Sequence, residues 1–115
     1  GAKKAYLAYF KENPEVPDPL FAAAHLLEMN DRPADAERMY KALLQSFEKN
    51  DAVWGRAAWL LASLYDHRLK RPNEAHALCH QIMRRMPKSE PGKRAVAWLV
   101  QHDEKPNDSS PPTTP

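Results

Sequence analysis

The stretch RPADAERMYKALL begins at Arg32, and RPNEAHALCHQIM begins at Arg71. Both passages open with Arg-Pro, place an alanine three residues after the proline, and continue with large apolar side chains at matching distances. Their starts are thirty-nine residues apart. Self-similarity at a fixed period is typical of repeat proteins, in which each unit stacks on the next to cover an apolar face. The two passages therefore predict a repeated helical unit.

Length and composition restrict the chain to one modest domain. It has 115 residues, 43% of them hydrophobic, which is too few for two independent cores. No apolar run reaches the roughly 18 residues of a membrane helix, and GAKKAYLAYF at the start does not read as a secretory signal. The single cysteine, Cys79, excludes an internal disulfide and fits a reducing compartment. We expect a cytoplasmic domain of a larger protein, in which a membrane anchor could lie elsewhere.

Apolar residues recur at three- and four-residue steps through the middle of the chain, which predicts about five helices. Asp18 is expected to cap the first helix, and Asn50 or Asp51 the third. Pro33 and Pro72 are expected to open the second and fourth helices, because proline is favoured at the first helical position. The expected inward-facing residues are Leu20, Ala23, Ala24 and Leu27; Ala36, Met39, Tyr40, Leu43, Leu44 and Phe47; Ala58, Leu61, Ala62 and Tyr65; Ala75, Leu78, Cys79, Ile82 and Met86; and Ala95, Val96, Leu99 and Val100.

These helices divide the chain into repeat-like parts. Residues 1–14 are expected to form the trailing helix of a preceding repeat that is otherwise missing. Residues 15–50 and 51–88 form two helix pairs, and residues 89–104 form a C-terminal capping helix. Residues 105–115 contain four prolines and no large apolar side chain, so we expect a disordered tail.

The second helix of each predicted unit repeats one spacing of small and large residues, with steps of four, three and five. Over residues 2 to 102 this spacing, together with LLASLY at 60–65, resembles the tetratricopeptide repeat (TPR) family, whose period is 34 residues. The resemblance implies an all-α, TPR-like α-solenoid of antiparallel helix pairs; a helical bundle without repeats is the alternative. The residues that carry the spacing are Ala2, Tyr6, Tyr9 and Pro14; Ala36, Tyr40, Leu43 and Glu48; and Ala75, Cys79, Ile82 and Pro87.

In the TPR family the first helix of each pair lines a concave groove that typically receives a peptide or a partner helix. The resemblance therefore implies a noncatalytic protein–protein interaction module or scaffold, with self-association as a related possibility. Some members of the family bind the C-terminal tail of a chaperone with a clamp of Lys and Asn side chains. This sequence does not have that clamp. The sequence favours neither the groove nor the core as the position of the Trp59 side chain. For the Trp98 side chain we favour the core. The expected groove residues are Phe21, His25, Glu28, Met29, Arg56, Trp59, Ser63, Asp66, His67, Arg94, Trp98 and Gln101.

The alternative function uses the positive charge of the region from Asp66 to Arg94, where eight Lys or Arg residues stand against three acids. This region could bind an anionic partner such as RNA, an acidic peptide or a lipid headgroup. Cations at helix C-termini also complement the helix dipole, and the net charge of the chain is only +2. We therefore do not expect nucleic acid as the main partner. The basic patch comprises Arg68, Lys70, Arg71, Arg84, Arg85 and Lys88.

We expect no catalytic residue, cofactor or metal. His76 and His80 are four residues apart and share a helix face, but two ligands do not make a metal site and Cys79 is expected to be buried. Asp66 and His67 are neighbours in sequence, so we expect their side chains to point in different directions on a helix. The glycines are isolated, so there is no phosphate-binding loop.

Overall fold

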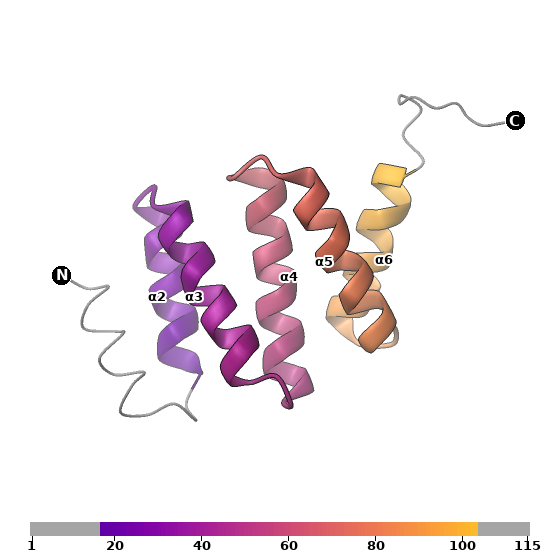
Figure 1. Ribbon diagram of the computed structural model, residues 1–115, viewed down its shortest axis with the longest axis horizontal. Helices are drawn as coiled ribbons and strands as arrows, with labels where there is room; N and C mark the ends of the chain where they lie inside the picture. The colour runs from indigo at the N-terminus through magenta and orange to yellow at the C-terminus, as the bar shows by residue number, and fades with distance from the viewer. Residues whose placement is uncertain (1–16, 104–115) are drawn as a thin grey trace, which may run out of the picture.

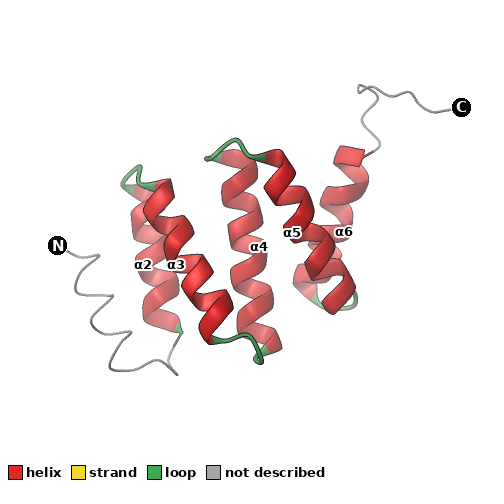
Figure 2. Ribbon diagram, viewed as in Figure 1, coloured by secondary structure: helices red, strands yellow, loops and turns green. Residues whose placement is uncertain are grey.

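The computed structural model describes residues 17–103, and all regular structure in that range is helical (Figure 2). Each helix packs against the next one along the chain, and α4 also packs against α6. Successive helices run in alternating directions, with α3 passing in front of α2, and α5 in front of α6, in Figure 1. None of the described helices is long and apolar enough to cross a bilayer. The helices are α2 (Asp18–Met29), α3 (Pro33–Ser46), α4 (Asp51–His67), α5 (Pro72–Arg85) and α6 (Glu90–Asp103).

The all-α prediction is confirmed for this part of the chain, and the predicted pairs correspond to α2–α3 and α4–α5. The predicted leading helix at 1–14 and the predicted tail at 105–115 lie outside the described residues. Glu104, the last residue of the predicted capping helix, lies outside them as well.

The sequence repeat is also a repeat of backbone structure. Helices α3 and α5 are each 14 residues long, and each begins at the proline of an Arg-Pro pair, as predicted. The residue before each Arg-Pro pair has a positive φ, which is 60° at Asp31 and 56° at Lys70. Non-glycine residues seldom adopt this left-handed conformation. The two inter-helix turns share this feature but differ in length, with three residues between α2 and α3 and four between α4 and α5.

Side-chain caps fix the starts of two helices. The Asn50 side chain accepts a hydrogen bond from the backbone N–H of Val53 at 3.2 Å, which confirms one of the two predicted caps for α4. Ser89 Oγ likewise accepts from the N–H of Gly92 at 3.0 Å at the start of α6. The cap predicted for Asp18 is wrong, since α2 begins at Asp18 itself, after a proline that offers no side-chain acceptor. The Asp18 carboxylate instead lies in the first turn, where the helix dipole favours negative charge.

The predicted inward-facing residues form one continuous core, with one exception. Val100 is 49% exposed because Trp98 and Leu99 supply the buried face at the end of α6. Leu44, Met86 and Val96 are half-buried at the margin of the core. The buried members of the predicted set are Leu20, Ala23, Ala24, Leu27, Ala36, Met39, Tyr40, Leu43, Phe47, Ala58, Leu61, Ala62, Tyr65, Ala75, Leu78, Cys79, Ile82, Ala95 and Leu99.

A matched pair of truncations tests this assignment of the core. Leu43 is fully buried in α3, whereas Leu26 on α2 is 38% exposed. We expect Leu43→Ala to lower the free energy of unfolding by about 2–5 kcal/mol, because it removes buried contacts and leaves a cavity. We expect Leu26→Ala to lower it by about 1 kcal/mol or less. Urea denaturation of both variants measures the difference, and equal losses would contradict the described packing.

Candidate functional site

Two adjoining hollows lie along α2, α4 and α6. The larger, of about 840 Å³, is lined mainly by α2, α4 and the start of α6. The smaller, of about 470 Å³, lies between α4 and α6. Trp59 and Arg94 line both, so the two hollows meet at these residues. We call them the larger hollow and the smaller hollow.

The structure gathers eleven of the twelve expected groove residues around these hollows. The exception is Met29, which is exposed at the end of α2 and lines neither of them. Trp59 is half-buried and packs on the core with one side while lining both hollows with the other. The larger hollow is lined by Phe21, His25, Glu28, Arg56, Trp59 and Arg94, and the smaller by Trp59, Ser63, Asp66, His67, Arg94, Trp98 and Gln101.

Buried aromatic residues and an arginine shape the larger hollow. The guanidinium carbon of Arg56 lies 3.9 Å from the centre of the Phe21 ring, within the range of a cation–π contact. Tyr40 Oη donates a hydrogen bond of 2.6 Å to Glu28 Oε2. Burial and this bond to Glu28 raise the pKa of Tyr40 well above its ordinary value, so the hydroxyl remains a donor. The wall between α2 and α3 is therefore fixed by a charge-assisted hydrogen bond.

The smaller hollow is organised around Asp66. Trp98 Nε1 donates to Asp66 Oδ2 at 3.0 Å, and His67 Nε2 and His102 Nε2 lie 3.7 and 3.9 Å from the same oxygen. The expectation that Asp66 and His67 point apart is therefore wrong, because their side chains approach each other to 3.7 Å. The His102 ring stacks on Trp98, with 3.7 Å between ring centres. Trp98 is only 9% exposed, so it belongs to the core and to the hollow at once.

Sequence reasoning missed several lining residues. Met86 and Ser89 line the larger hollow from the α5–α6 connection, and Glu90 and Pro91 line it from the first turn of α6. His102 lines the smaller hollow, and its position four residues after Trp98 was a usable signal, since residues at that step share a helix face. The remaining lining residues that were missed are Tyr40, Asp51, Ala52, Leu60 and Ala97.

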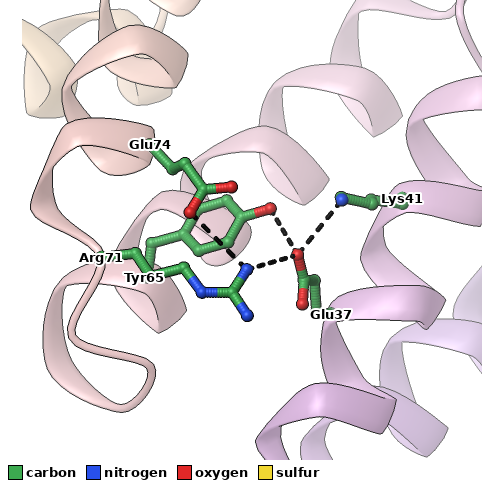
Figure 3. Close-up of polar contacts among 5 residues, drawn as sticks. All are labelled: Glu37, Lys41, Tyr65, Arg71 and Glu74. Carbon is green, nitrogen blue, oxygen red and sulfur yellow. Dashed lines mark hydrogen bonds and ion pairs between the residues drawn. The ribbon is translucent and has the colours of Figure 1, made fainter.

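A second polar site, which the sequence did not reveal, lies between the two helix pairs (Figure 3). Glu37 on α3 is only 8% exposed. Its Oε2 accepts a hydrogen bond from Tyr65 Oη of α4 at 2.7 Å and lies 3.1 Å from Lys41 Nζ and 3.3 Å from Arg71 Nη1. Arg71 also reaches Glu74 of α5 at 3.6 Å. One carboxylate thus ties α3 to α4 and to the turn before α5.

The surroundings of Glu37 favour its charged form. Burial alone would raise its pKa, but the hydrogen bonds from Tyr65 and Lys41 and the charges of Lys41 and Arg71 outweigh burial and lower it. Burial and the bond to Glu37 raise the pKa of Tyr65, which keeps its proton on the hydroxyl. Glu37 is therefore an ionised carboxylate at neutral pH, and Tyr65, Lys41 and Arg71 compensate its charge.

Three members of the predicted basic patch are engaged within the chain. Arg68 donates to the backbone oxygen of Glu28 at 2.8 Å, and Arg71 belongs to the Glu37 site. Arg85 pairs with Asp51 at 2.9 Å, donates to the backbone oxygen of Glu48, and covers the ring of Trp54. Lys70, Arg84 and Lys88 are exposed. Half of the patch therefore joins helices and turns to one another.

The paired histidines of α5 lie close together, with 4.6 Å between the ring centres of His76 and His80. Cys79 between them is buried. Burial, with a smaller effect from the charge of Asp66, raises the pKa of the Cys79 thiol to about 12. Within residues 17–103, no group of three or more His, Cys, Asp or Glu side chains is arranged to hold a metal ion.

Comparison of the chain with protein-family models, with curated proteins and with solved structures gives no match. The TPR resemblance therefore depends on the residues and the repeat geometry described above.

The Glu37 site predicts a specific pH dependence of stability. Because folding lowers the pKa of Glu37, its stabilising effect is fully present above its unfolded pKa of about 4.3 and is lost as pH falls through the lower folded pKa. We expect Glu37→Gln to lower the free energy of unfolding by about 1–3 kcal/mol at pH 7. The difference from wild type should shrink below about pH 5. Denaturant titrations at several pH values measure it, and a difference that is constant down to pH 3 would contradict this role.

The buried thiol predicts low reactivity. Because the thiolate is the reactive form, we expect Cys79 to react with a disulfide reagent at pH 8 at a small fraction of the rate of a free cysteine. The reaction should become fast and stoichiometric in denaturant. Absorbance of the released thiol measures both rates, and rapid labelling of the folded chain would contradict the described burial.

Proposed function

We propose that the chain is a noncatalytic module that binds a peptide or helix of a partner protein in the two hollows. The observation that carries this proposal is the placement of Phe21, Trp59 and Arg56, from α2 and α4, around one open hollow of about 840 Å³. Aromatic residues and arginine dominate binding hot spots, and the volume lies within the range of sites that enclose a ligand.

The same proposal treats the fold as a TPR-like solenoid. Its support is the equal length of α3 and α5, the positive φ that precedes the Arg-Pro pair at the start of each, and the lining of both hollows mainly by α2, α4 and α6. In a solenoid, the equivalent helix of every unit contributes to one continuous surface. Partner binding on that surface is what the resemblance to the TPR family leads us to expect.

The basic patch is a weaker basis for function. Arg68, Arg71 and Arg85 already have acidic or carbonyl partners within the chain. An anionic partner would have to compete with these contacts, which join separate helices and turns. The two modes of binding also differ in salt response, because binding through the patch should weaken steeply with salt, whereas binding anchored on Trp59 and Phe21 should not.

Peptides selected from an unbiased display library on the full chain test the proposal. We expect a synthetic peptide from the enriched pool to bind Trp59→Ala at least about tenfold more weakly than wild type, since hot-spot aromatics contribute about 2 kcal/mol or more. Fluorescence anisotropy of the labelled peptide measures the affinities. Because Trp59 also touches the core, exposed Arg56→Ala serves as a second variant, and circular dichroism checks the folding of both.

Gln81→Ala is the matched control. Gln81 is exposed on α5 and lines neither hollow, so its truncation should leave the affinity unchanged. The proposal fails if no library peptide depends on Trp59 or Arg56, or if the selected peptides lose affinity equally in the control.

A further inference from the structure

The charges around the two hollows are unequally compensated. Arg94 lines both hollows from α6 and is exposed. Within residues 17–103, its guanidinium makes no hydrogen bond or ion pair. A guanidinium that is held at the junction of two hollows without a partner can pair with a carboxylate from outside.

Three acidic residues of the lining, Glu28, Asp51 and Asp66, by contrast have polar contacts within the chain. Glu28 accepts the Tyr40 hydroxyl at 2.6 Å, and Asp51 pairs with Arg85 at 2.9 Å. Glu90 is the first residue of α6, where the helix dipole favours its charge. In the smaller hollow, Asp66 accepts from Trp98 Nε1 and lies near two imidazoles.

A second cation reinforces this imbalance. The Arg56 guanidinium lies over the Phe21 ring, and it forms an ion pair of 3.9 Å with the exposed carboxylate of Asp18. Such a long, solvent-exposed pair contributes little. Arg56 on α4 and Arg94 on α6 are therefore both available to a ligand in the larger hollow, which Trp59 also lines.

We propose that the two hollows bind an amphipathic segment of a partner protein that carries a carboxylate side chain close to a large apolar side chain. The carboxylate pairs with Arg94, and the apolar side chain covers Trp59. This inference rests on the proposed function and names the chemistry of the partner. Isolated carboxylates suit the site better than a phosphate backbone, because the closely spaced charges of nucleic acid would also meet Glu28, Asp51 and Glu90.

Parallel selections test the proposal. One peptide library is selected on wild type, on Arg94→Glu and on Lys93→Glu, a matched control because Lys93 is the adjacent exposed cation and lines neither hollow. We expect the wild-type and Lys93→Glu pools to be enriched in Asp or Glu near a large apolar residue. The Arg94→Glu pool should lose this enrichment and gain Lys or Arg.

A pairwise measurement then isolates the contact. Replacing the enriched Glu of a selected peptide by Gln should weaken binding to wild type about threefold to fivefold, as expected for an exposed ion pair at the strong end of the usual range. The same replacement should have no effect on binding to Arg94→Gln. Circular dichroism confirms that each variant is folded.

The outcomes separate the inference from the function on which it rests. In one outcome, peptides bind and depend on Trp59, but the Glu→Gln replacement leaves their affinity unchanged or the wild-type pool is enriched in basic residues. The proposed pairing of a ligand carboxylate with Arg94 is then overturned, and the proposed binding of a peptide in the hollows stands. If no selected peptide depends on Trp59, both are overturned.

Discussion

The contact between α3 and α4 joins the two helix pairs, and the rest of the described structure depends on it. Residues of both pairs belong to one continuous core, so buried apolar contacts hold the two pairs together. Glu37 lies in this contact as a buried carboxylate that Tyr65, Lys41 and Arg71 compensate. Removing one partner of such a site leaves a buried charge or donor uncompensated, which is costly. The site therefore favours one register between the pairs over others.

The packing of the helices places residues of α2, α4 and α6 around the same two hollows. Phe21, Trp59 and Trp98 belong to α2, α4 and α6, and each is both packed on the core and part of a hollow. Hydrogen bonds fix the neighbouring polar groups, as in the contact of Trp98 with Asp66. Rigid aromatic walls lose little entropy when a ligand binds, so this face is suited to recognition.

Sequence could predict features that local chemistry determines. The Arg-Pro starts, the Asn50 cap and the apolar steps within one helix depend on neighbouring residues, and the structure agrees with them. It could not predict Glu37, whose burial depends on Tyr65, twenty-eight positions away in the chain. Val100 was misplaced because two apolar stripes compete on the last helix, and only packing against α5 and α4 decides between them.

The most direct test of partner binding in the two hollows uses the three tryptophans as internal probes. Trp59 and Trp98 line the hollows, whereas Trp54 lies under Arg85 on another surface. In a titration with a selected peptide, followed through the indole N–H signals by NMR, the account predicts that the Trp59 and Trp98 signals shift and that the Trp54 signal stays in place. A shift of the Trp54 signal alone, with the other two unmoved, would contradict it.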